Sequence, residues 1–231
     1  LHTVENDEYC TVCGFKMVAK AEIDGDVLYF ATMDDALATL FGSNKDGKIT
    51  LLDNGTLYGE HTSQEGKNYI LDLNGYEITV IAVINVSSES VLTVQDTSQL
   101  QNGCIYAEES SFTAICVYGE LIFNSGSICG IIDLIGVEEY TAKATINGGT
   151  FMGAVSFILY DYSQLDILGG TFTETGFVDI YGVSATVKIT LRGGVFEKGI
   201  EIYDNNGELI ILSLLPKDEC EICFVDKNGS K

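Results

Sequence analysis

Four segments of this chain repeat one pattern and decide its fold: LIFNSGSICG at Leu121–Gly130, ATINGGTFMG at Ala144–Gly153, LDILGGTFTE at Leu165–Glu174 and ITLRGGVFEK at Ile189–Lys198. Each reads as a short alternating strand, a glycine-containing turn, a small residue and then a large apolar one. The apolar residues before the turn are Phe123, Ile146, Ile167 and Leu191, and those after it are Ile128, Phe151, Phe172 and Phe196. Both columns are spaced by 23, 21 and 24 residues, which indicates a true internal repeat.

A period of about 20 to 25 residues, built from short strands and glycine turns, is typical of the coils of a β-solenoid. Neighbouring coils pair at about 4.8 Å, so equivalent side chains stack and a phenylalanine column is expected inside. We predict an all-β fold, a parallel β-helix of about seven coils. A sandwich of antiparallel hairpins is the alternative, but it would need turn pairs every ~8 to 12 residues and no long-range register.

Earlier segments fit the repeat more loosely, and they are Lys48–Gly55, Tyr69–Gly75 and Val91–Asp96. The step of 29 residues from Val94 to Phe123 predicts an insertion around 97–102.

The open ends of a solenoid need caps, because they expose both core and strand edges. Asp26–Phe30 reads as a strand, and Thr32–Leu40 as a helix with Thr32 as N-cap and Asp35 completing a capping box. The apolar face of this helix predicts a short N-terminal helical cap. We divide the chain into a Cys-x-x-Cys linker (1–20), a strand and helix cap (21–47), the β-helix (48–215), and a closing strand with a tail (216–231). In the last part, Glu221–Asp226 is the expected strand.

The segments ILDLNGYEI (70–78) and LTVQD (92–96), followed by repeated GGTF turns, resemble the right-handed, pectin-lyase-like parallel β-helix. This family occurs in secreted and cell-surface proteins of bacteria. The N-terminal LHTVENDEYCTVCG is similar to linkers that precede such modules in large surface proteins. The resemblance implies the right-handed winding and an extracellular, surface location.

The charge and hydrophobicity of the chain exclude several classes of partner. With 12 basic and 34 acidic residues the net charge is −22, which repels nucleic acid and anionic membranes. We expect no membrane insertion, because no apolar run approaches the ~18 to 20 residues of a membrane helix. The chain opens on a polar segment, so we expect any targeting segment to have been removed or to lie upstream.

Seven cysteines leave at least one thiol unpaired within the chain. Cys104, Cys116 and Cys129 lie in apolar strands and read as buried hydrophobic residues. Weak candidates for metal ligands are His2, Cys10 and Cys13, although no fourth ligand is evident. The second pair, Cys220 and Cys223, should lie at the far end of the solenoid, too distant to share a zinc ion within one chain.

Enzyme functions are disfavoured by the sequence. Lyases of the resembled shape combine an acidic calcium site with a basic residue, and hydrolases combine three Asp with Gly-His-Gly and Arg-x-Lys. Here Arg192 is the only arginine, and His2 and His61 lie in neither motif. We therefore expect no enzyme and no cofactor, with a polysaccharide lyase or hydrolase as the remaining alternative.

Two outward columns on one face of the solenoid are the candidate ligand site. The first is expected to contain Cys116, Asp133, Ile158, Asp179 and Glu201, and the second Tyr118, Ile135, Tyr160, Tyr181 and Tyr203. Stacked tyrosines beside acids suit sugar rings, although they also stabilise a sheet face without any ligand. The leading hypothesis is a non-catalytic module, adhesive or glycan-binding, whose partner is a glycan or another extracellular surface ligand. A structural spacer or stalk is the alternative.

Overall fold

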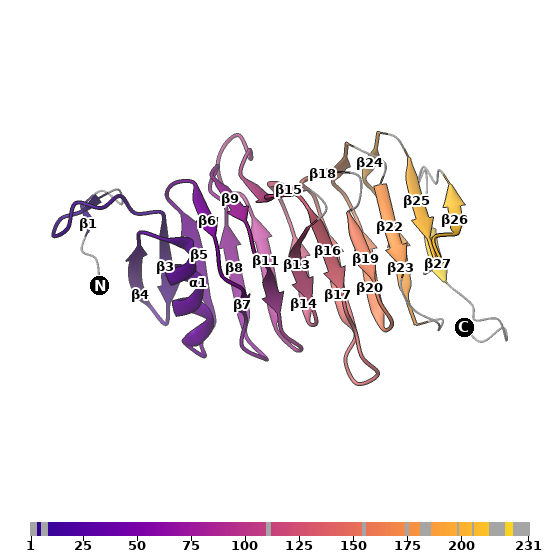
Figure 1. Ribbon diagram of the computed structural model, residues 1–231, viewed down its shortest axis with the longest axis horizontal. Coiled ribbons are helices and arrows are strands. Elements are labelled where there is room, and N and C mark those ends of the chain that lie inside the picture. Colours follow the sequence, from indigo (N-terminus) through magenta and orange to yellow (C-terminus); the bar gives the residue numbers. More distant parts are fainter. Residues whose placement is uncertain are drawn as a thin grey trace.

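The computed structural model describes residues 4–5, 9–109, 112–153, 156–173, 176–180, 186–197, 199–204, 206–212 and 220–223. It is an all-β parallel solenoid with one short helix, as the repeat predicted. The coils stack into a rod, with the indigo N-terminal elements at one end and the yellow C-terminal strands at the other (Figure 1). Within the described residues, each of the three faces has seven parallel strands. About six turns of the solenoid connect these strands.

Each coil contributes one strand to each face, in chain order. The first face contains β5 (Gly47–Leu51), β8 (Asn68–Asp72), β11 (Val91–Gln95), β14 (Glu120–Phe123), β17 (Ala142–Ile146), β20 (Ser163–Ile167) and β23 (Lys188–Leu191). The second contains β6 (Gly55–Leu57), β9 (Glu77–Val80), β12 (Cys104–Ala107), β15 (Ser127–Cys129), β18 (Thr150–Met152), β21 (Thr171–Phe172) and β24 (Val195–Phe196). The third contains β7 (His61–Thr62), β10 (Ile84–Val86), β13 (Thr113–Val117), β16 (Ile131–Leu134), β19 (Phe157–Leu159), β22 (Gly176–Ile180) and β25 (Ile200–Tyr203).

The register of the strands confirms both predicted inner columns. Phe123 pairs with Ile146, Ile146 with Ile167, and Ile167 with Leu191 on the first face. On the second face, the pairs are Ile128 with Phe151, Phe151 with Phe172, and Phe172 with Phe196. All of these side chains are buried, so the periodic apolar residues form the core.

The predicted insertion is also present. The connection from Gln95 in β11 to Cys104 in β12 is longer than the equivalent one from Asp72 to Glu77. A second lengthened connection, from Ala107 to Thr113, was not expected.

The N-terminal end is capped by a helix and a hairpin. α1 (Met33–Gly42) begins at Thr32, which accepts the backbone N–H of Asp35 and donates its hydroxyl to the Asp35 carboxylate. The apolar face of α1 packs against the first coil, while β3 (Ala19–Ile23) and β4 (Asp26–Phe30) extend the first face by antiparallel pairing. β1 (Val4–Glu5) and β2 (Tyr9–Cys10) form a separate antiparallel pair.

At the C-terminal end, two antiparallel strands follow the repeat. β26 (Leu209–Leu212) pairs with β25, and β27 (Cys220–Cys223) pairs with β23. The expected closing strand at Glu221–Asp226 overlaps β27, and its residues 224–226 lie outside the described residues. No helix among the described residues is long and apolar enough to cross a membrane.

Candidate functional site

The register of the third face agrees with the expected acidic column over four strands and differs from it at the fifth. Cys116 pairs with Asp133, Asp133 with Ile158, and Ile158 with Asp179. Asp179 then pairs with Tyr203, whereas Glu201 pairs with Phe177. The last step is 24 residues, the same as from Phe172 to Phe196, so the register of the phenylalanine column could have placed Tyr203 correctly.

The second expected column, which already had Ile135 between Tyr118 and Tyr160, loses Tyr203 to the first column. Tyr118 and Tyr160 both directly follow a strand of the third face, but Ile135 occupies the equivalent position on the strand between them. The two Cα atoms are therefore two strand spacings apart, about 10 Å. Tyr203 belongs to the other column, where its hydroxyl donates to Glu201 at 2.8 Å. Tyr181 and the side chain of Asp179 lie outside the described residues.

Tyr118 instead lines an open aromatic pocket with a residue that the sequence analysis did not consider. This Tyr118–Tyr140 pocket has a volume of about 290 Å³, and its lining residues are Ser87, Ser88, Tyr118, Ile135, Val137 and Tyr140. Both tyrosines are 40% exposed, so their rings are available to a ligand at the surface.

A short hairpin between β16 and β17 carries Tyr140 and projects from the edge of the solenoid (Figure 1). Val137 and Tyr140 exchange both backbone hydrogen bonds, at 2.9 and 3.0 Å, which closes the hairpin. A Cβ atom at Gly136 would collide with the carbonyl group of Tyr162, so glycine is needed where the hairpin leaves the coil. The long connection from Leu134 to Ala142 was the sequence signal for this element.

Hydrogen bonds among serines hold the turn that contributes Ser87 and Ser88 to the pocket. The hydroxyl groups of Ser63 and Ser90 lie 2.7 Å apart, and both side chains are buried. Ser63 accepts the backbone N–H of Ser87, and Ser90 donates to the Ser87 carbonyl. This network fixes the turn that contributes Ser87 and Ser88 to the pocket.

The pKa values of Tyr118 and of two residues near it, Cys116 and Asp133, are raised. A hydrogen bond with Cys116, followed by burial, raises the pKa of Tyr118 to about 12. Burial raises the pKa of Cys116 as well. Burial also raises the pKa of Asp133, which accepts the Thr113 hydroxyl through Oδ2 and whose buried Oδ1 has no hydrogen-bond partner. Tyr118 therefore presents an uncharged phenol ring at neutral pH.

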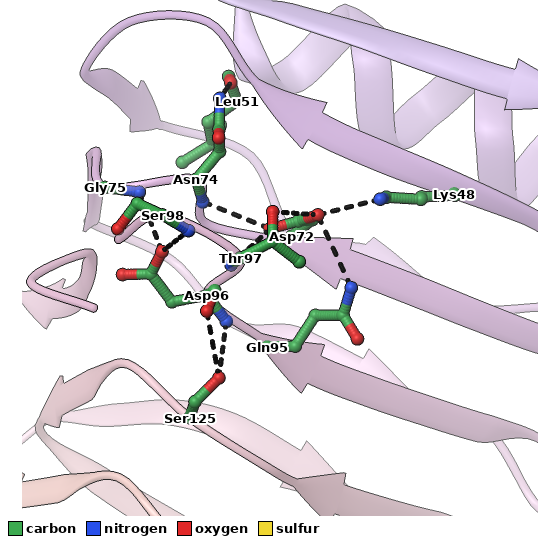
Figure 2. A network of polar contacts seen from close by, with 10 residues as sticks. All are labelled: Lys48, Leu51, Asp72, Asn74, Gly75, Gln95, Asp96, Thr97, Ser98 and Ser125. Carbon is green, nitrogen blue, oxygen red and sulfur yellow. Dashed lines mark hydrogen bonds and ion pairs between the residues drawn. The ribbon is translucent and has the colours of Figure 1, made fainter. Parts of the chain in front are cut away.

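Two other acids, Asp72 and Asp96, are buried where strands of the first face end (Figure 2). Asp72 lies 2.7 Å from the Lys48 ammonium group and accepts hydrogen bonds from Thr97. Burial acts to raise the pKa of Asp72, but these contacts outweigh burial and lower it. The charged carboxylate is thus a fixed part of the scaffold.

Asp96 has the same role one coil further along the solenoid (Figure 2). Its Oδ1 accepts the backbone N–H groups of Gly75 and Ser98, both at 2.9 Å, and its Oδ2 accepts that of Gly103 at 2.6 Å. Sequence analysis missed this pair, because acids in turns are common in a chain with 34 acidic residues. Both carboxylates tie neighbouring turns together.

The cysteines do not assemble into a metal centre within the described part of the chain. No group of three potential metal ligands occurs there, and His2 lies outside it. Cys10 and Cys13 lie close together, and the backbone N–H of Cys13 donates to the Cys10 sulfur at 3.5 Å. β27, which contains the second pair, lies at the opposite end of the rod (Figure 1). Of the three cysteines in the parallel strands, Cys116 is buried, while Cys104 and Cys129 are half-buried.

Comparisons with protein-family models, with curated proteins and with solved structures find no match to this chain.

Proposed function

We propose that this chain is a non-catalytic, glycan-binding module of a secreted or wall-attached bacterial surface protein. The observation that carries the proposal is the Tyr118–Tyr140 pocket, which two half-exposed tyrosines and two serines line. Aromatic rings offer a flat apolar surface to the C–H face of a sugar, and hydroxyl groups hydrogen-bond at its edge. The bacterial origin and the surface location rest on the sequence resemblance to pectin-lyase-like modules.

The charge of the chain limits the class of glycan. A net charge of −22 repels uronates, sulfated sugars and other anionic chains, and no lysine or arginine lines the pocket. Neutral glycans are therefore the expected ligands.

A glycan-array screen of the full chain tests this proposal, followed by titration of the best ligand. Tyr118→Ala and Tyr140→Ala should each weaken binding by about tenfold, because each removes one stacking surface. Tyr106→Ala is the matched control, since Tyr106 is 39% exposed but lies on the second face. Equal binding by all three variants and the parent would reject the pocket as the site.

A spacer function is the second candidate, and the shape of the molecule favours it. Seven levels of described strands form a rod whose first and last strands lie at opposite ends, which suits a module that separates its neighbours (Figure 1). A spacer needs no ligand, so an empty glycan array together with high stability would favour this function.

A further inference from the structure

A larger cavity lies at the N-terminal end of the rod, between the N-terminal cap and the first coil. Its volume is about 560 Å³, within the range of small-molecule sites. Val18, Ala31 and Met33 provide apolar lining from the cap, and Asn54, Thr56 and Tyr58 line it from the first coil. This cap cavity is separate from the Tyr118–Tyr140 pocket, and none of its lining residues is shared.

Asp34 fixes the aromatic wall of the cap cavity. Its carboxylate accepts the backbone N–H of Tyr58 at 3.2 Å and that of Gly59 at 2.7 Å, and it lies 3.1 Å from His61 Nε2. These contacts hold the segment after β6 against the start of α1. Asp34 is thus a positioning residue, while the Tyr58 side chain remains 70% exposed at the cavity.

The polar groups around the cavity can both donate and accept hydrogen bonds. The carboxylate of Asp35 accepts, the amide of Asn54 and the hydroxyl of Thr56 can do both, and an apolar surface adjoins them. A ring with one C–H face and several hydroxyl groups matches this combination, since its face can stack on Tyr58 while its hydroxyl groups donate to Asp35.

The lining also excludes anionic ligands. Asp34 and Asp35 both border the cavity, and no lysine, arginine or histidine is among the lining residues. A ligand carboxylate or sulfate would meet two like charges without a compensating cation.

We propose that the cap cavity is a second binding site, specific for a neutral pyranose residue. Tyr58 provides the stacking surface, and Asp35 accepts the hydroxyl hydrogen bonds. The site stands independently of the Tyr118–Tyr140 pocket.

Nuclear magnetic resonance titration of the full chain tests this site, with methyl β-glucoside, methyl β-galactoside and methyl α-mannoside as probes. At least one probe should shift the amide resonances of Thr56 and Tyr58, whereas glucuronate at the same concentration should shift neither. Tyr58→Ala should weaken the binding about tenfold. The thermal stability of this variant should stay near that of the parent, because the Tyr58 side chain is mostly exposed.

Matched variants separate this site from the first one. Tyr118→Ala and Tyr106→Ala should keep the parental affinity at the cap cavity. The proposal is wrong if no probe shifts these resonances, if glucuronate binds equally well, or if Tyr58→Ala binds like the parent. None of these results would bear on binding at the Tyr118–Tyr140 pocket, which the Tyr118→Ala titration reports.

Discussion

At the scale of single residues, the inner phenylalanines form a stack that crosses several coils. The ring centroids of Phe151 and Phe172 lie 4.7 Å apart with an interplanar angle of 15°, and those of Phe172 and Phe196 lie 4.5 Å apart at 8°. This distance is close to the spacing of the paired strands, so backbone pairing and ring stacking share one geometry. Each ring therefore supports the coil on either side.

Removing the ring of Phe172, which lies between those of Phe151 and Phe196, should destabilise the fold. Phe172→Ala leaves a cavity between two stacked rings, and we expect it to lower the free energy of unfolding by about 3–5 kcal/mol. Chemical denaturation of the variant and the parent measures this difference, with Tyr106→Ala as the exposed aromatic control. A loss below about 1 kcal/mol would mean that the site is not part of a packed core.

Single residues also show what could and could not be predicted from the sequence. The buried position of Phe172 could be predicted, because the apolar residues of the core recur at the same position in each coil. Tyr140 could not, since a loop residue has no periodic neighbour to fix its position. Glu201 was misplaced because the column was aligned by residue type rather than by the 24-residue step of the core. The carboxylate of Asp96 was missed because its partners are backbone N–H groups, which carry no sequence signature.

At the scale of elements, the N-terminal cap illustrates how a helix is attached to a solenoid. The capping box of Thr32 and Asp35 was visible in the sequence, because it depends on residues three positions apart. The attachment through Asp34 to Tyr58, Gly59 and His61 joins residues more than twenty positions apart and emerged only in three dimensions. Local signals thus predicted the helix, and tertiary contacts determine where it lies.

Breaking this attachment should loosen the cap without unfolding the coils. Asp34→Ala leaves the N–H groups of Tyr58 and Gly59 without their acceptor, so we expect a loss of about 1 kcal/mol and faster hydrogen exchange at the Gly59 amide. Glu108→Ala, which removes an exposed carboxylate elsewhere, is the control. Unchanged exchange at Gly59 would show that the contact does not hold the cap.

The attachment should also depend on pH. Burial acts to raise the pKa of Asp34, but hydrogen bonds from His61, Gly59 and Tyr58 lower it below its usual value. Because the pKa of Asp34 is lower in the folded than in the unfolded state, its contribution to stability is complete above the unfolded pKa, near 4. This contribution is lost as the pH falls through the folded-state pKa. The difference in stability between parent and Asp34→Ala should therefore shrink below about pH 4. A constant difference down to pH 2 would contradict this assignment.

At the scale of the whole molecule, the acidic charge bears on the possibility of catalysis. A lyase acting on polyuronates needs an ionised base beside the abstracted proton and a cation that neutralises the substrate carboxylate. Asp133 accepts the Thr113 hydroxyl, and Lys48 is paired with buried Asp72. We expect no release of unsaturated products from polygalacturonate or alginate, with or without calcium, as measured by ultraviolet absorbance. Product formation that disappears in Asp133→Asn would overturn this expectation and make the acidic column of the third face an active site.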